Sequence, residues 1–105
     1  MTTIDRHEMA GSTYLPPSYI YKNCKIVQFR CVGYAKKELN TGTAYQVGTL
    51  PEKYRPVADL YKYEQFVKGK ECQVIILTTG EITVQFFENV SVDGAMNINV
   101  YFIAK

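Results

Sequence analysis

The segment Cys72-Gln-Val-Ile-Ile-Leu-Thr-Thr-Gly-Glu-Ile-Thr-Val-Gln-Phe86 decides the class of the fold. Its first part, Cys72–Leu77, is an apolar run typical of a central strand that is buried on both faces. Thr79-Gly80 predicts a tight turn, because glycine supplies the positive φ that short hairpin turns need. From Glu81 to Glu88 apolar and polar residues alternate, as they do in a strand with one buried face. The segment is therefore predicted to be a β-hairpin.

Similar alternation predicts strands over much of the remaining chain. Turn signals such as Asn40–Thr43, Lys68–Lys70 and Asp93-Gly94 recur about every 8–12 residues, and we find no convincing helical stretch. The predicted fold is all-β, an antiparallel sandwich or barrel. The further strands are expected at Ser18–Tyr21, Lys25–Tyr34, Ala44–Val47, Val57–Val67 and Ala95–Ala104.

The size and charge of the chain narrow the class of protein. Its 105 residues suit one domain, and its nine tyrosines and five phenylalanines favour a pleated surface with aromatic contact areas. A net charge of +2 is too small to indicate nucleic acid as the main partner. No apolar run reaches the roughly 18 residues of a membrane span, and the N-terminus lacks the order of a signal peptide. We therefore expect neither nucleic-acid binding nor membrane insertion.

The domain is expected to begin after a poorly patterned start. Residues 1–13 show no clear period and are interpreted as an N-terminal lead or linker. Pro16-Pro17 stiffens the chain where the folded part begins. Residues 14–105 are then expected to form the folded domain, a β-sandwich.

Residues that could carry catalysis or a metal are few. His7, the only histidine, lies in the expected lead, and the carboxylates do not form the pair that a glycosidase needs. The cysteines at 24, 31 and 72 are odd in number and lack metal-like spacing, so we expect reduced, mostly buried thiols, with a disulfide through Cys72 as an alternative. The prediction is a non-enzymatic protein with no metal and no cofactor.

A two-proline loop separates the halves of the chain. Its proline rings fix φ and remove backbone donors, and they push the preceding residues towards extended conformations. We expect a stiff structural loop that passes from one sheet to the other. Leu50 and Tyr54 would pack as plugs, and Arg55 would bond to carbonyls or pair with Glu52. The loop residues with this expected role are Leu50, Pro51, Tyr54, Arg55 and Pro56.

The same loop carries a resemblance. The phrase VGTLPEKYRP at Val47–Pro56 resembles one found in the β-sandwich heads of bacteriophage tail-fibre and baseplate proteins, although Lys53 stands where that family often has glycine. Three further segments occur in the family's order, so that the resemblance covers about Tyr14 to Lys105. These segments are Lys22–Tyr34, Cys72–Phe86 and Asn97–Lys105.

The resemblance implies an antiparallel β-sandwich or jelly-roll-like head, often a homotrimer, at the tip or periphery of a phage or prophage tail. Such a head would be assembled in the bacterial cytoplasm and would reside in the virion. It would recognise a host cell-surface saccharide, or it would be purely structural and bind other tail proteins. A monomeric carbohydrate-binding module is the third alternative. The family offers no shared binding motif that could be transferred to this chain.

Candidate binding residues follow from the strand faces instead. Saccharide sites typically combine flat aromatic rings with amides and carboxylates, because sugars present both C–H faces and hydroxyls. Either of two such groups could form a shallow sugar site, a seam between subunits or ordinary surface. The first group is Asp59, Tyr61 and Tyr63, and the second is Asn97, Asn99 and Tyr101.

Overall fold

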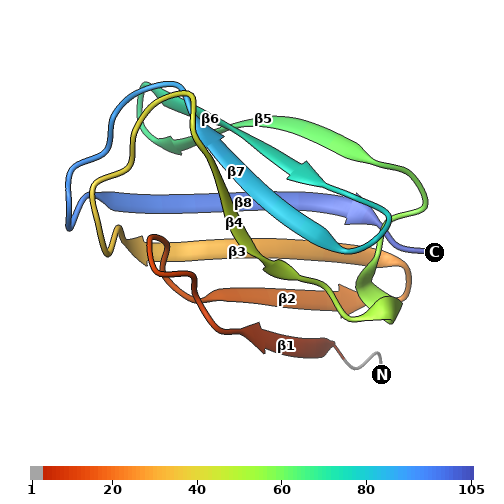
Figure 1. The fold of residues 1–105 in the computed structure, drawn as a ribbon. Helices are drawn as coiled ribbons and strands as arrows, with labels where there is room; N and C mark the ends of the chain where they lie inside the picture. The colour runs from red at the N-terminus through yellow and green to blue at the C-terminus, as the bar shows by residue number, and fades with distance from the viewer. Residues whose placement is uncertain (1–3) are drawn as a thin grey trace.

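The computed structural model describes residues 4–105, which form two four-stranded antiparallel sheets packed as a β-sandwich (Figure 1). The first sheet has the order β1-β2-β3-β8 and the second the order β4-β7-β6-β5. The predicted all-β sandwich is confirmed. The strands are β1 (Asp5–Met9), β2 (Ser18–Asn23), β3 (Ile26–Tyr34), β4 (Ala44–Thr49), β5 (Leu60–Val67), β6 (Lys70–Ile76), β7 (Glu81–Phe86) and β8 (Ala95–Ile103).

From β3 onward, the strands pair as a nested ladder. Strand β5 pairs with β6, β4 with β7 and β3 with β8, and β6 also pairs with β7. The three pairs β5–β6, β4–β7 and β3–β8 are therefore nested in the sequence, each one enclosing the pair before it. The hairpin predicted at Cys72–Phe86 is β6–β7, and Gly80 in its turn has φ of 95°.

The core lies between the sheets and follows the alternation of the strands. In β8 every second residue from Met96 to Phe102 is buried, and the residues between them, such as Asn97, are exposed. Phe66 of β5 meets Phe86 of β7 edge-on, with ring centroids 4.9 Å apart. Such aromatic pairs add to the burial of apolar surface, which is the main force that holds the two sheets together.

The N-terminal segment differs from the expectation of a lead. Asp5–Met9 forms β1, the edge strand of the first sheet, and pairs with β2 over five residues. Only Met9 of these residues is buried, so the segment has no apolar pattern for the sequence to reveal. Backbone pairing, not side-chain burial, places most of this strand. The expected lead thus contributes a strand to the sandwich.

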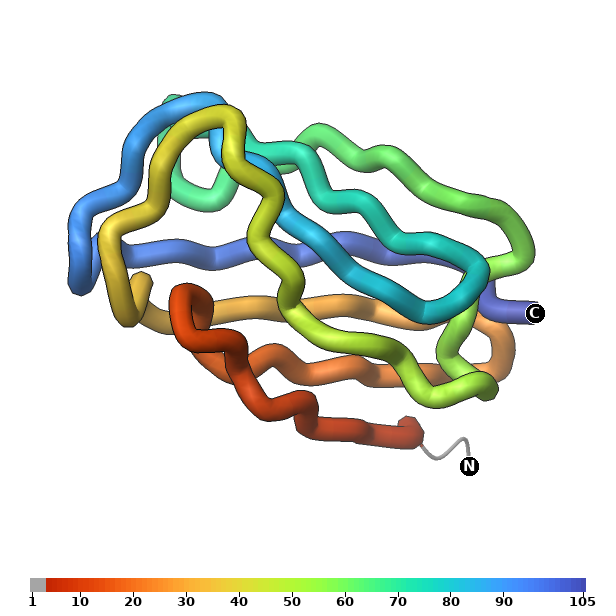
Figure 2. The backbone as a smooth tube through the Cα atoms, in the orientation of Figure 1, coloured from red at the N-terminus to blue at the C-terminus, as the bar shows by residue number. Residues whose placement is uncertain are grey.

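The two-proline loop does not pass between sheets, and that expectation was wrong. Strands β4 and β5 both belong to the second sheet, where they form its opposite edges. The loop therefore runs across the end of the sandwich from one edge of this sheet to the other (Figure 2). On the way Glu52–Tyr54 makes one 3-10 turn, and Pro56 forms a bridge with Ala104 at the end of the first sheet.

The three thiols are free and differ in exposure. Cys31 and Cys72 are buried as expected, and burial raises the pKa of each thiol to about 12. Cys24 is exposed, because it lies in the turn between β2 and β3 with φ of 57°. Only Cys24 is therefore placed to react with reagents in solution.

Candidate binding site

The two predicted groups lie on opposite outer faces of the sandwich. Asn97, Asn99 and Tyr101 are exposed on β8 of the first sheet. Tyr61 and Tyr63 are exposed on β5 of the second sheet. Because the core separates the two sheets, these groups cannot act on one small ligand together.

The outer face of the first sheet gathers further polar and aromatic residues around Asn99 and Tyr101. Strand pairing places Arg6, Tyr21, Gln28 and Tyr101 in one row across all four strands. Neighbours in such a row have Cβ atoms about 4.5–5.5 Å apart, so a ligand can touch several at once.

A second row runs beside the first, through Glu8, Tyr19, Arg30 and Asn99. Asn97 lies outside both rows, opposite Val32. We call the surface made by the β2, β3 and β8 residues of the two rows the tyrosine–amide face. Its members are Tyr19, Tyr21, Gln28, Arg30, Asn99 and Tyr101.

Contacts within the tyrosine–amide face hold its polar groups in place. Gln28 Nε2 donates a hydrogen bond of 2.8 Å to Asn99 Oδ1, which joins β3 to β8. The Arg6 guanidinium lies 4.7 Å from the centroid of the Tyr19 ring, a cation–π arrangement. Tyr19 and Tyr21 are half-buried, whereas 57% of Tyr101 is exposed. The face thus combines fixed rings with one ring that is free to contact a ligand.

The charges on the tyrosine–amide face remain available to a ligand. The single ion pair found among residues 4–105 is Lys53–Asp5, so Arg30 has no carboxylate partner within this part of the chain. A guanidinium offers several donors in a fixed plane and suits hydroxyl, carboxylate or phosphate oxygens. Amides, tyrosine rings and an unpaired guanidinium together match the mixed surface of a sugar.

The outer face of the second sheet is less available. The Tyr63 ring stacks on Phe87 with centroids 5.9 Å apart and planes 18° apart, so one ring face of each residue is covered. Asp59 precedes β5, and its Oδ1 accepts a 2.8 Å hydrogen bond from the backbone N–H of Thr78. Asp59 is thus held at the start of the strand that carries Tyr61 and Tyr63, and the exposed rings of these tyrosines and of Phe87 form an aromatic patch.

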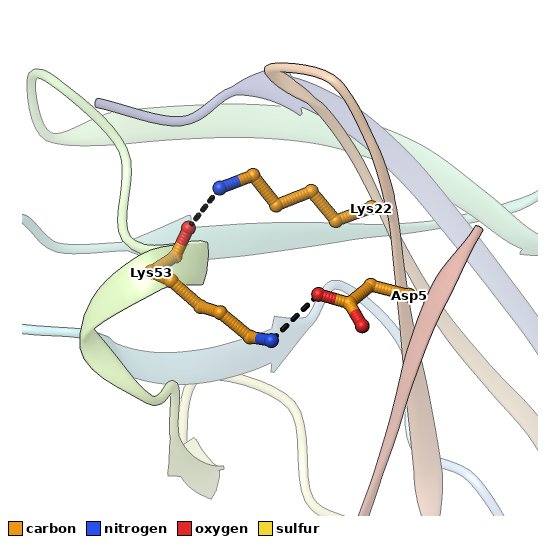
Figure 3. Close-up of polar contacts among 3 residues, drawn as sticks. All are labelled: Asp5, Lys22 and Lys53. Carbon is orange, nitrogen blue, oxygen red and sulfur yellow. Dashed lines mark hydrogen bonds and ion pairs between the residues drawn. The ribbon is translucent and has the colours of Figure 1, made fainter. Parts of the chain in front are cut away.

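The loop residues contact the protein itself. Leu50 and Tyr54 are buried, as expected. Arg55 Nε donates a 3.0 Å hydrogen bond to the Leu50 carbonyl, which is the first of the two contacts expected for Arg55. Lys53 pairs with Asp5 of β1 at 2.6 Å, and its own carbonyl accepts a 2.7 Å hydrogen bond from Lys22 Nζ (Figure 3). The hydrogen bond to Asp5 raises the pKa of Lys53. These contacts tie the loop to the first sheet.

Sequence reasoning missed part of the tyrosine–amide face. Gln28 and Arg30 alternate with the buried side of their strand, so the sequence did place them outward. Tyr19 and Tyr21 fall in a predicted strand, but their position beside Gln28 depends on a register that one sequence does not reveal. Arg6 lies in the segment taken for a lead. The registers of β1 with β2 and of β2 with β3 would have shown that these residues lie side by side.

No group of three or more His, Cys, Asp or Glu side chains in residues 4–105 is arranged to hold a metal ion. Within the same range, no helix is long and apolar enough to cross a membrane. Comparison of the chain with models of protein families finds no match, and comparison with curated proteins finds none either. Function is therefore inferred from the fold and from the chemistry of its surfaces.

Proposed function

We propose that this chain is the non-enzymatic head domain of a phage or prophage tail protein and binds a host cell-surface saccharide. The tyrosine–amide face is the binding surface in this proposal. The observation that carries it is the double row of tyrosines and amides on an exposed sheet face, with Gln28 hydrogen-bonded to Asn99. Beside them lies Arg30, which has no ion-pair partner among residues 4–105. The ordered motifs of the sequence, which resemble those of phage tail heads, support the setting.

The roles of the residues follow from their chemistry. The Tyr101 ring, 57% exposed, would stack on the C–H face of a sugar ring. The Asn99 amide and the Arg30 guanidinium would bond to its hydroxyls or to an acidic substituent. Because Gln28 already bonds to Asn99, the amides lose little freedom when a ligand binds.

A purely structural head is the second candidate, and the second sheet supplies the observation that favours it. Tyr61, Tyr63 and Phe87 are 59%, 66% and 46% exposed on that side of the molecule. Exposed aromatic clusters of this kind are common at protein interfaces. In this candidate the aromatic patch would join copies of the head, or the head to other tail proteins.

A binding assay on the intact protein tests the saccharide proposal. The protein is applied to glycan arrays and to envelope fractions of candidate host bacteria, with Tyr101→Ala and Arg30→Gln as the test variants. Both are expected to weaken binding at least fivefold, since each removes one direct contact.

Tyr63→Ala is the matched control, because it removes a tyrosine of similar exposure from the opposite face. Light scattering checks that every variant has the same mass as the parent, so that multivalency does not differ. The proposal fails if no envelope fraction binds the parent, or if Tyr63→Ala weakens binding while Tyr101→Ala does not.

A further inference from the structure

A groove lies at the end of the sandwich where the two-proline loop enters β5. The bridge between Pro56 and Ala104 holds this part of the loop beside the last residues of β8, as Figures 1 and 2 show. The groove has a volume of about 420 Å³, and Tyr101 is the one residue of the tyrosine–amide face that also lines it. A volume of this size falls in the range of small-molecule sites, about 300–1,000 Å³.

The groove wall is apolar and unusually exposed. Ile26 and Ile103, which are cross-strand partners, are 55% and 53% exposed, and Val57 is 63% exposed. Leu60 and Phe102 complete the apolar wall. Large apolar side chains that meet at one exposed place mark a site where apolar surface is covered by a ligand.

One charged residue, Lys62, lines the groove. It is half-buried on β5 and has neither an ion-pair nor a hydrogen-bond partner within residues 4–105. Asp59, which accepts a hydrogen bond from the Thr78 N–H, makes no ion pair with Lys62. A half-buried ammonium without an anion favours a ligand that carries one.

We propose that the groove binds a small amphiphilic anion, namely an aliphatic or arylaliphatic carboxylate. Its apolar body lies on Ile26, Val57 and Ile103, and its carboxylate meets the Lys62 ammonium. This site is independent of the proposed saccharide binding. The choice of a small carboxylate rests on two features together: the apolar wall and the unpaired cation beside it.

The test uses sodium decanoate as the probe, below the concentration at which it forms micelles, and follows the intact protein by NMR. Decanoate is expected to shift the resonances of Ile26, Lys62 and Ile103 saturably. Decylammonium, with the same chain and the opposite charge, is expected to bind at least tenfold more weakly. Lys62→Gln is expected to lower the affinity for decanoate about fivefold, because the pair is partly exposed to solvent.

Two further variants separate the groove from the rest of the surface. Val57→Glu is expected to abolish binding, since it puts a carboxylate at the apolar wall. Val92→Glu and Lys68→Gln, which change exposed residues outside the groove, are expected to bind decanoate like the parent. The proposal is overturned if decanoate does not bind at millimolar concentration, if decylammonium binds as tightly, or if the shifted resonances are those of Tyr19, Arg30 and Asn99, which lie on the tyrosine–amide face but do not line the groove.

Discussion

At the scale of single residues, Gly80 explains how the β6–β7 hairpin docks on the two-proline loop. Leu50 N donates a 2.8 Å hydrogen bond to the Gly80 carbonyl. A Cβ at position 80 would lie 2.7 Å from the Leu50 carbonyl oxygen and 2.8 Å from Arg55 Nε. Any side chain would therefore push the hairpin turn away from the loop that it holds.

Gly80→Ala is expected to lower the free energy of unfolding by about 3 kcal/mol, because strain at positive φ adds to the clash with backbone. Gly69→Ala is the matched control: Gly69 has φ of 80° but nothing within 4 Å of an added Cβ. It should cost only about 1 kcal/mol. Urea unfolding measures both variants, and equal losses would contradict the docking role of Gly80.

The buried thiols predict a loss of stability at alkaline pH. Burial raises the pKa of Cys31 from 9.0 to about 12, so the native state keeps a proton that the unfolded chain releases. Stability contributed by this thiol is therefore complete below pH 9 and falls as the pH rises from 9 towards 12. The expected slope is about −1.4 kcal/mol per pH unit for one thiol.

Denaturant unfolding measured across this pH range checks the slope. Cys31→Ala should show a shallower fall than the parent, whatever its stability at neutral pH. Cys24→Ala, which changes the exposed thiol, should leave the slope unchanged. The same slope in all three proteins would show that Cys31 does not control the alkaline response.

At the scale of elements, β1 is the least buried strand. Four of its five residues are exposed, and Met9 alone reaches the core, where its Cε lies near Gly48 of β4. An ion pair at the surface contributes little by itself, so the Asp5–Lys53 contact does not fix the strand. The strand depends on its backbone pairing with β2 and on one methionine.

Met9→Ala is expected to lower the free energy of unfolding by about 2 kcal/mol and to speed hydrogen exchange of the β1 amides. Glu8→Ala, on the same strand but exposed, should change stability by less than about 0.5 kcal/mol. Denaturant unfolding and exchange monitored by NMR give the two quantities. If both variants behave alike, Met9 does not anchor the strand.

The elements also show which features one sequence can reveal. Alternation predicted β3, β7 and β8 because their inner residues face one core. It could not reveal β1, since Asp5 to Glu8 bury no apolar side chain. It also misjudged the loop, because the sheet that receives β5 is set by pairing with β6 and not by any local signal. The tyrosine–amide face was predicted only in part for the same reason. Alternation identified Asn99 and Tyr101 as outward residues of β8, but not which residues of β2 and β3 lie beside them.

At the scale of the whole molecule, the sandwich presents two unlike outer faces. The tyrosine–amide face carries Arg30, two amides and three tyrosine rings. The aromatic patch on the second sheet carries the stacked Tyr63 and Phe87. Opposite faces allow one side to join copies while the other stays open to a ligand.

We expect light scattering to give three times the chain mass of 12.0 kDa, because the phage tail heads that the sequence resembles are often homotrimers. A Tyr63→Lys/Phe87→Lys double variant should dissociate the trimer, because two ammonium groups would be buried in the seam. Tyr101→Lys, on the other face, should leave the mass unchanged. A monomeric parent protein at micromolar concentration would rule the trimer out.

The nested ladder has a consequence for how the chain folds. Strands β5 and β6 meet over a short turn, whereas Gln28 and Asn99, which bond across β3 and β8, are 71 residues apart. Such distant pairing makes refolding slow, on the order of milliseconds to seconds. During synthesis β3 stays without its β8 partner until Ala95–Ile103 has left the ribosome. A chain that stops short of β8 would present Val27, Phe29 and Cys31 along an open strand edge, and it would be prone to aggregate.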